Sequence, residues 1–244
     1  STIVIFFWGT TVFLNNLAQA IADAPAPFTT ILIFFSTEPT NEKLIQSNET
    51  KPPTFKETIL DNKKSFTIGG SGHFIMQFLR QCRHVLIPIW AFSIGLGVEE
   101  LGLIQSISAA IDMTLFYPVG LIMDKYGRKW TSVPSIILLS LGFIFMTYVD
   151  SFNGLMLVGL LLGFANGLGS GAMLTLGSDL SPKNQPGSFL GIWRLFGWSG
   201  NSAGGPISGA IAQTVGNTAS ALSISMIGGI GVIIFSFLLP ETLK

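Results

Sequence analysis

Gly120-Leu-Ile-Met-Asp124-Lys125-Tyr-Gly127-Arg128-Lys129 sets a tight group of charges between two long apolar segments. An apolar stretch of about 20 residues is long enough to cross a bilayer as a helix. Basic residues in the short loops between such helices stay on the cytoplasmic side. The string therefore predicts a cytoplasmic turn between two membrane-spanning helices.

The composition is that of a membrane protein. Of 244 residues, 48% are hydrophobic and 11% are charged, whereas soluble domains carry about 25% charged residues. The 13 basic and 13 acidic residues balance, and the basic ones lie between apolar blocks. They do not form the continuous basic stripe that binds nucleic acid. The lipid bilayer is therefore an expected partner, and a nucleic acid is not.

Six apolar segments predict an all-α, polytopic bundle of transmembrane helices within residues 65–244. They run at about 65–90, 101–123, 130–149, 154–178, 188–212 and 218–239. Residues 1–37 are also apolar but contain Asp23, Pro25 and Pro27, which leaves open one kinked span or a span with a fragment. Residues 38–64 are polar and predict a flexible linker, with or without a short surface helix.

The lysines and arginines outside the spans predict the orientation of the chain. With six spans after the linker, the basic segments fall on one side of the membrane and the acidic turns on the other. The basic positions are the linker, Lys125–Lys129, Lys183 and Lys244, and the acidic ones are Glu99, Glu100 and Asp150. We expect a cytoplasmic linker and carboxy terminus, in a plasma membrane rather than an organelle.

The string at 120–129 resembles the Gly-x-x-x-Asp-Arg/Lys-x-Gly-Arg-Lys/Arg signature of the major facilitator superfamily, which recurs in both halves of those transporters. Gly120 permits close helix approach, and Gly127 permits a tight turn. Asp124 can face Arg128 or the amino terminus of a neighbouring helix. We expect a conformational latch made of Gly120, Asp124, Lys125, Gly127, Arg128 and Lys129. The alternative is a basic turn that only fixes topology.

The resemblance extends from about Ser65 to the end of the chain. Pro240-Glu241-Thr242 is similar to the sequence that closes many members, particularly sugar-porter relatives. Gly200-Asn-Ser-Ala-Gly204-Gly205-Pro206-Ile-Ser-Gly209 resembles the Gly-Pro motif of proton-coupled antiporters. It departs from that motif because Ala210 replaces a final glycine, and because the motif usually lies in the fifth span of the whole transporter.

The resemblance implies a carboxy-terminal half, with residues 1–37 forming the last span or spans of the preceding half. Two such halves enclose a central site in this family, so the missing amino-terminal half is an expected partner. Another alignment makes the chain an amino-terminal half. The closing motif and the basic linker favour the carboxy-terminal assignment.

Two sets of small residues predict close helix packing. Gly159, Gly163, Gly167 and Gly171 recur every fourth residue on one helix face. The second set is Gly200, Gly204, Gly205, Pro206 and Gly209. A smooth face on which helices slide is the functional alternative. Asn166 and Asn201 are polar within spans, and we expect them to bond between helices rather than contact substrate.

Ionisable side chains inside spans are costly and are candidates for function. Arg80 and Arg83 lie near the middle of the first span after the linker, and are expected to bind an anionic or strongly polar substrate. Asp112 is expected to accept a proton or compensate charge, and His84 to titrate near physiological pH. With Arg194, these residues would line one central cavity. In the alternative, the two arginines reach the cytoplasmic headgroups.

The sequence carries no phosphate-binding loop, metal-ligand cluster or nucleophile elbow, so we expect no enzyme and no cofactor. The resemblance implies secondary transport of a small molecule by alternating access, with protons as the expected coupling ion. The indications of the substrate disagree. The closing motif favours sugars, the Gly-Pro motif favours exported drugs or metabolites, and the arginine pair favours anions. The alternatives are a truncated, non-transporting subunit or ligand sensor, and a membrane-embedded enzyme that uses Asp112 and His84.

Overall fold

The computed structural model describes residues 55–169, 171–183 and 186–238. The chain divides into two units, Ser1–Pro52 and Pro53–Lys244, and the second contains every described residue. The predicted spans within 1–37, most of the linker and the closing Pro240-Glu241-Thr242 lie outside the described residues. The described part contains helices and no strands, which confirms the all-α class.

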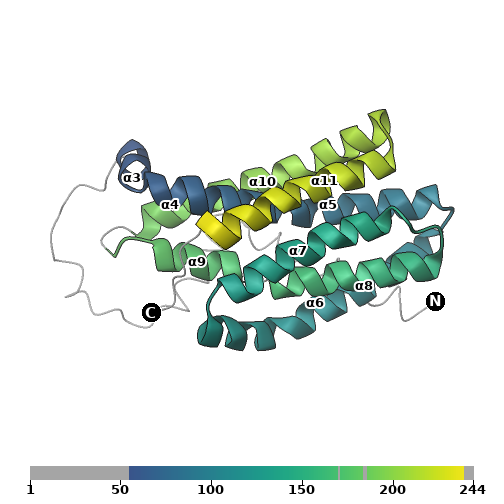
Figure 1. The fold of residues 1–244 in the computed structure, drawn as a ribbon, viewed down its shortest axis with the longest axis horizontal. Coiled ribbons are helices and arrows are strands. Elements are labelled where there is room, and N and C mark those ends of the chain that lie inside the picture. Colours follow the sequence, from purple (N-terminus) through teal and green to yellow (C-terminus); the bar gives the residue numbers. More distant parts are fainter. Residues whose placement is uncertain (1–54, 170, 184–185, 239–244) are drawn as a thin grey trace, which may run out of the picture. The chain divides into compact units, whose positions relative to one another are not determined.

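Six long helical segments make up the described unit (Figure 1). They are α5 (Ser71–Ser93), α6 (Val98–Tyr126), α7 (Lys129–Met146), α8 (Phe152–Leu168) followed by α9 (Ala172–Leu180), α10 (Pro186–Thr214) and α11 (Asn217–Ile233). Shorter pieces are α3 (Phe55–Asp61), α4 (Lys63–Ser65), the π-helix η2 (Phe66–Gly70) and the π-helix η3 (Ile234–Leu238). Each apolar segment predicted after residue 64 coincides with one long segment.

Four of these segments are long and apolar enough to cross a membrane: α6, α7, α8 with α9, and α11 with η3. The other two, α5 and α10, are as long but more polar. Helix α5 carries two arginines and two histidines, and α10 is rich in glycine and serine. These two helices pack extensively against each other. The two long segments that fall short of this apolarity therefore pack against each other.

Helices α6 and α8 pack closely because α8 presents glycines to α6. A Cβ atom on Gly159 would lie 2.7 Å from Ile104 Cγ2, and one on Gly167 would lie 2.7 Å from Leu115 Cδ1. A Cβ on Gly163 would collide with the backbone carbonyl of Ser108. Any larger residue would force the two helices apart.

The span predicted at 154–178 is not one continuous helix. Helix α8 ends at Leu168, and α9 starts after Gly171, which has φ of +75°. Glycine reaches this left-handed region without a steric penalty. The expectation that Gly171 continues the packing stripe was therefore wrong, since this residue forms the break instead.

The glycines of α10 divide into packed and unpacked positions. A Cβ on Gly204 would lie 2.8 Å from the Phe78 carbonyl oxygen of α5, and one on Gly200 would collide with the Phe74 carbonyl. Beside Gly205 the neighbouring side chain is at an ordinary distance of 3.5 Å. Beside Gly209 a Cβ would meet nothing within 4 Å in the described part of the chain. Of the glycines predicted to pack here, only Gly200 and Gly204 therefore require a close approach of α5.

Gly120 and Pro206 also differ from expectation. A Cβ on Gly120 would meet no described atom within 4 Å, so no helix of this unit approaches it closely. Pro206 is exposed within α10, and the helix continues past it to Thr214. In the described unit, neither residue marks a close contact between helices.

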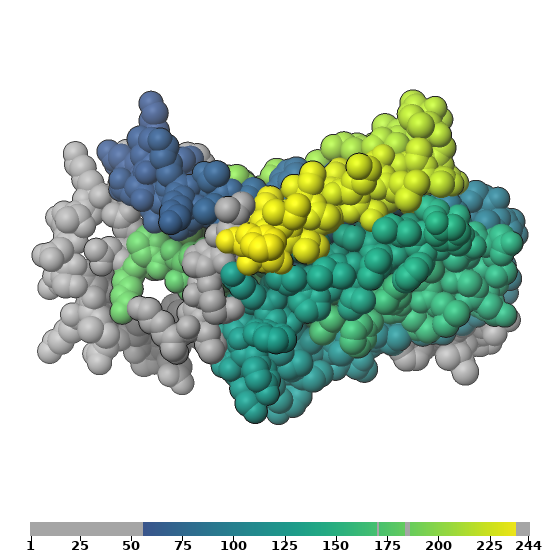
Figure 2. Space-filling view, in the orientation of Figure 1, coloured from purple at the N-terminus to yellow at the C-terminus, as the bar shows by residue number. Residues whose placement is uncertain are grey.

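Hydrogen bonds between neighbouring segments lie at the two ends of the bundle. At one end, Lys129 Nζ donates to the Ser236 carbonyl at 3.3 Å, which joins the start of α7 to η3. At the other end, Trp90 Nε1 donates to the Val149 carbonyl at 2.9 Å, beside the acidic Asp150. The space-filling view shows α11 lying directly against α7 between these ends (Figure 2). The basic and acidic loops thus occupy opposite ends of the described unit.

Candidate functional site

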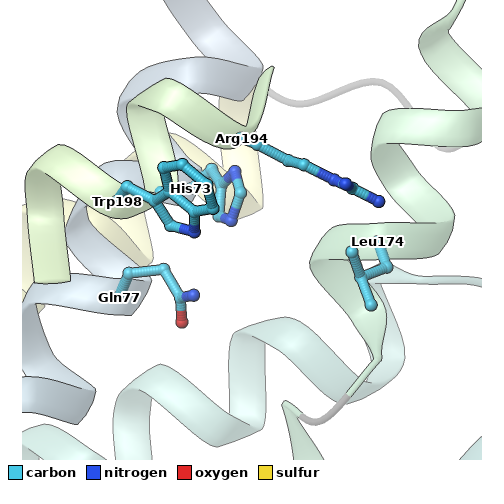
Figure 3. A pocket seen from close by; sticks show the side chains of 6 residues that line it. His73, Gln77, Leu174, Arg194 and Trp198 are labelled. Carbon is cyan, nitrogen blue, oxygen red and sulfur yellow. The ribbon is translucent and has the colours of Figure 1, made fainter. Parts of the chain in front are cut away.

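A pocket of about 220 Å³ lies between α5, α9 and α10 (Figure 3). Its lining residues are His73, Gln77, Leu174, Arg194, Gly197 and Trp198. The Arg194 side chain extends from α10 towards Leu174 on α9, across the opening from Gln77. Arg194 is the one arginine, and no carboxylate is present, among the described lining residues. The pocket is therefore suited to an acceptor-rich or anionic group.

His73 forms a fixed wall of this pocket. The residue is 4% exposed, and its ring stacks on Trp193 with centroids 5.1 Å apart. Nδ1 lies 3.1 Å from the Trp193 carbonyl oxygen and donates to it, because a carbonyl only accepts. A Cβ on Gly197 would lie 2.5 Å from His73 Nε2, so the missing side chain makes room for the imidazole.

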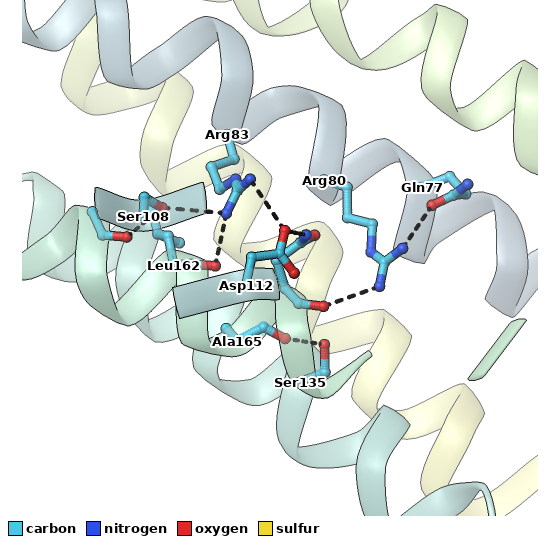
Figure 4. A network of polar contacts seen from close by, with 10 residues as sticks. Gln77, Arg80, Arg83, Ser108, Asp112, Ser135, Leu162 and Ala165 are labelled. Carbon is cyan, nitrogen blue, oxygen red and sulfur yellow. Dashed lines mark hydrogen bonds and ion pairs between the residues drawn. The ribbon is translucent and has the colours of Figure 1, made fainter. Parts of the chain in front are cut away.

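A second polar centre joins α5, α6 and α8 around Arg83 (Figure 4). Arg83 is 3% exposed. One of its terminal nitrogens donates to the Leu162 carbonyl at 3.2 Å and to Ser108 Oγ at 3.5 Å. The other lies 4.0 Å from Asp112 Oδ2. A charge so deeply buried needs such partners, so Arg83 is anchored by two neighbouring helices.

Arg80 binds the carboxy-terminal end of α8. Its guanidinium donates to the Asn166 carbonyl at 3.2 Å, in the last turn of that helix, where carbonyls lack regular helical partners. A positive charge also interacts favourably with a helix carboxy terminus. The same guanidinium lies against Gly169, where α8 stops. Arg80 therefore stabilises the break between α8 and α9.

Asp112 and Asn166 complete this centre. Asn166 Nδ2 donates to Asp112 Oδ2 at 2.5 Å, which is the interhelical hydrogen bond expected for Asn166. Four buried atoms of this centre have no hydrogen-bond partner among the described residues: Arg80 Nε, Arg83 Nε, Asp112 Oδ1 and Asn166 Oδ1. A cluster with a purely structural role would normally satisfy such atoms. Two donors and two acceptors of this centre are therefore left without a partner among the described residues.

Gln77 connects the pocket to this charged centre. Its side chain lines the pocket, and its Oε1 accepts from Arg80 at 3.5 Å. Arg80 in turn contacts the Asn166 carbonyl, and the Asn166 amide contacts Asp112. A continuous series of polar contacts therefore runs from the pocket on α5 to Asp112 on α6.

The charged turn between α6 and α7 pairs with α9. Arg128 Nε lies 2.8 Å from Asp179 Oδ2, and Arg128 also donates to the Met123 carbonyl at 3.2 Å. Gly127, with φ of +100°, supplies the expected tight turn. We expected Asp124 to face Arg128 or the amino terminus of a neighbouring helix. In the structure Asp124 is exposed, and the carboxylate that pairs with Arg128 is that of Asp179. The partner lies 51 residues along the chain, so local spacing did not indicate it.

The other predicted residues lie apart from one another. Lys125 Nζ sits 5.2 Å from the centre of the Tyr126 ring. His84 is exposed and forms no hydrogen bond within the described residues. Arg194 is also exposed and lines the pocket rather than joining Arg80 and Arg83. The five ionisable residues therefore do not share one cavity: Arg80, Arg83 and Asp112 meet in the polar centre, Arg194 lines the pocket, and His84 belongs to neither.

Residues 70–244 match the sequence profile of the Major Facilitator Superfamily. The chain belongs to this superfamily. Two curated relatives are both described as the multi-drug resistance efflux pump PmrA, one from Streptococcus pneumoniae serotype 4 and one from Streptococcus pneumoniae strain R6. Each is 29% identical over 157 residues, which cover 62% of this chain and 37% of the relative. The match thus spans little more than a third of each relative's length.

Membership of the Major Facilitator Superfamily makes the chain an integral, multi-pass membrane protein of a transporter family and not an enzyme. The matched region contains all of the polar centre, the pocket and the Arg128–Asp179 ion pair. Sequence reasoning missed His73 and Gln77, although both lie on the helix that carries Arg80 and Arg83. Gln77 precedes Arg80 by three residues, a spacing that places both on one helix face.

Proposed function

We propose that this chain is the six-helix carboxy-terminal half of a secondary transporter that exports a small molecule by alternating access, with protons as the coupling ion. The observation that carries the proposal is the series of contacts from the pocket through Gln77 and Arg80 to Asp112. It links a place where a solute fits to the partly buried carboxylate of Asp112. The described relatives, named as efflux pumps, support export.

Asp112 is the proposed proton acceptor. When a proton binds Asp112, the negative charge that faces Arg83 disappears, and the attraction between α5 and α6 at this point is lost. Protonation therefore favours conformations in which Arg83 has moved to other partners. The unpartnered buried nitrogens and oxygens of this centre support such an exchange of partners. His84 is exposed on α5, the helix of Arg83, and is proposed as the residue through which protons reach this centre.

Helix α9 is the proposed moving element at the basic end. The break at Gly169–Gly171 separates it from α8. Trp193 Nε1 donates to the Met173 carbonyl at 2.9 Å, and Asp179 pairs with Arg128. The ion pair thus acts as a latch that holds α9 to the α6–α7 turn in one conformation. Family members rock two bundles about a central site, so an amino-terminal half is the proposed partner.

The proposed orientation places the α6–α7 turn, the linker and the carboxy terminus in the cytoplasm. It rests on the basic loops, because Lys125, Lys129 and Lys183 precede or follow spans at one end while Glu99 and Asp150 lie at the other. The proposed location is a plasma membrane. In that arrangement the pocket and the latch are both reached from the cytoplasmic half of the bundle.

Reversing the latch charge should slow transport. Arg128→Asp replaces attraction to Asp179 with repulsion, a change of about 1–2 kcal/mol for a partly exposed pair, or about tenfold in the balance between two conformations. We expect about a tenfold lower flux with unchanged membrane insertion. The double variant Arg128→Asp with Asp179→Arg should recover most of the flux, as measured in vesicles.

Asp124→Asn is the comparison for this latch, since it removes an exposed carboxylate of the same signature. A loss of flux in Asp124→Asn as large as in Arg128→Asp, without recovery in the charge swap, would show that the signature does not act through Asp179. Recovery in the swap alone would support the ion pair.

Flux measurements in sealed vesicles test the proposed function directly. The full chain is reconstituted alone and with the amino-terminal half proposed to precede it, and ethidium, 2-naphthamide and 2-naphthoate are offered as solutes. We expect movement of at least one solute to depend on an imposed pH gradient and on both halves. Folded protein that moves none of them in either preparation would instead support a non-transporting subunit or sensor.

A further inference from the structure

We propose that the pocket between α5, α9 and α10 binds an amphipathic organic anion, with its negative group at Arg194 and its flat apolar body against Trp198 and Leu174. The existence of the pocket does not depend on the proposed function, but the assignment of this anion as the transported solute does. The chemical class is an aryl or fused-ring carboxylate.

The charge of the pocket selects an anion. Arg194 extends into the opening from α10, and no acidic side chain lies among the described lining residues. Behind Gln77, Arg80 adds a second guanidinium. The two polar centres together contain three arginines, Arg80, Arg83 and Arg194, against one carboxylate, Asp112. A cation would therefore enter a site of excess positive charge, whereas an anion would reduce that excess.

The walls of the pocket select a flat apolar body. Trp198 is 64% exposed and Leu174 is 62% exposed, both at the pocket. An indole ring gives a broad surface on which an aromatic ring stacks. The volume of about 220 Å³ lies below the range of roughly 300–1,000 Å³ typical of drug-sized ligands. A one- or two-ring acid therefore fits better than a large multi-ring drug.

The polar floor of the pocket orients the bound group. The Nδ1 bond to Trp193 holds His73 in place, and Gln77 presents an amide whose oxygen already accepts from Arg80. The amide nitrogen of Gln77 is then the group left to donate to a carboxylate. A carboxylate between Arg194 and Gln77 would accept from both helices, α10 and α5, and would join them across the opening.

The charge of the solute sets the electrical character of the exchange. One proton moving inward against one monovalent anion moving outward transfers two positive charges inward. Transport of 2-naphthoate should therefore accelerate when the vesicle potential favours that direction, even without a pH gradient. An uncharged solute exchanged for one proton transfers only one charge and should respond less.

Equilibrium dialysis of the full chain in lipid nanodiscs tests this pocket independently of transport. The probes are 2-naphthoate, its neutral isostere 2-naphthamide, and the cation 2-naphthylmethylammonium. We expect 2-naphthoate to bind at least tenfold more tightly than either of the others. Arg194→Gln should abolish this preference, and Arg194→Lys should keep part of it, because lysine retains the charge but not the planar fork.

Lys183→Gln is the matched control, since it removes an exposed positive charge that does not line the pocket. It should leave the preference unchanged. Because 2-naphthamide needs no positive charge, its binding to Arg194→Gln within threefold of the starting chain would show an intact pocket. Equal binding of acid and amide to the starting chain would overturn the proposal, as would an Arg194→Gln variant with undiminished preference.

The two proposals fail in different ways. A preference for 2-naphthoate that depends on Arg194, without flux in vesicles, would support the anion pocket and overturn transport. Gradient-driven movement of ethidium with no binding or movement of 2-naphthoate would support transport and overturn the anion assignment.

Discussion

Arg83→Met should destabilise the bundle by roughly 3–5 kcal/mol, the cost of leaving one member of a buried ion pair without its partner. Asp112 would keep its hydrogen bond from Asn166 but would lose the guanidinium at 4.0 Å. The Leu162 carbonyl and Ser108 would also lose a donor. Thermal unfolding followed by tryptophan fluorescence, in lipid nanodiscs, measures the effect.

Adding Asp112→Asn to Arg83→Met should restore most of the lost stability, because the double variant contains no unpaired charge at this position. Arg194→Met is the matched comparison, since Arg194 is exposed and its removal should cost less than about 1 kcal/mol. Hydrogen bonds between membrane helices average only about 0.6 kcal/mol, so the size of the loss separates an unpaired charge from lost hydrogen bonds. If Arg83→Met unfolds like Arg194→Met, the buried pair does not stabilise the helix contacts.

The long helices could be predicted from the sequence because span length and apolarity are physical requirements of the bilayer. The segment predicted at 101–123 lies within α6, and the one at 130–149 overlaps α7. The break between α8 and α9 could not be predicted in this way. Glycine every fourth residue suits a straight packing face as well as a break, and only the backbone conformation at Gly171 distinguishes them.

Charge inside a span identified Arg80, Arg83 and Asp112 as interesting, and the structure brings these three together. The same reasoning placed Arg194 with them, yet it faces a pocket one helix away. The rotation of each helix about its own axis decides which side chains meet. A single sequence does not reveal which faces of two helices are in contact. Gln77 was missed because it is uncharged, and the candidates for function were the charged side chains within spans.

Pairing across long distances in sequence was the least predictable feature. Arg128 has a nearby carboxylate at Asp124, but in the structure it pairs with Asp179 from another helix. A charged residue at a helix end can pair with a residue three to five positions away in the sequence, or with a residue on another helix that packs against the same end. The signature indicates that the turn is charged, and only the packing of α9 selects the partner.

Asp112→Asn should reduce gradient-driven flux by at least a hundredfold while exchange of solute across the membrane continues within a few fold. Asparagine can still accept the hydrogen bond from Asn166, but it cannot take up a proton. Solute movement would then no longer be coupled to proton movement. Asp150→Asn, in the turn between α7 and α8, removes an exposed carboxylate and should transport normally.

Loss of folding is the competing explanation for an inactive Asp112→Asn, because this change leaves Arg83 unpaired. The double variant Arg83→Met with Asp112→Asn separates the two causes, since it should fold like the starting chain and still fail to couple flux to the gradient. A folded double variant that accumulates solute normally under a pH gradient would remove Asp112 from the proton pathway. A folded double variant that exchanges solute but cannot concentrate it would place proton coupling at the contact between α5 and α6, provided that Arg83→Met alone still accumulates solute under the gradient, because Asp112 would then be the change that separates driven from passive movement.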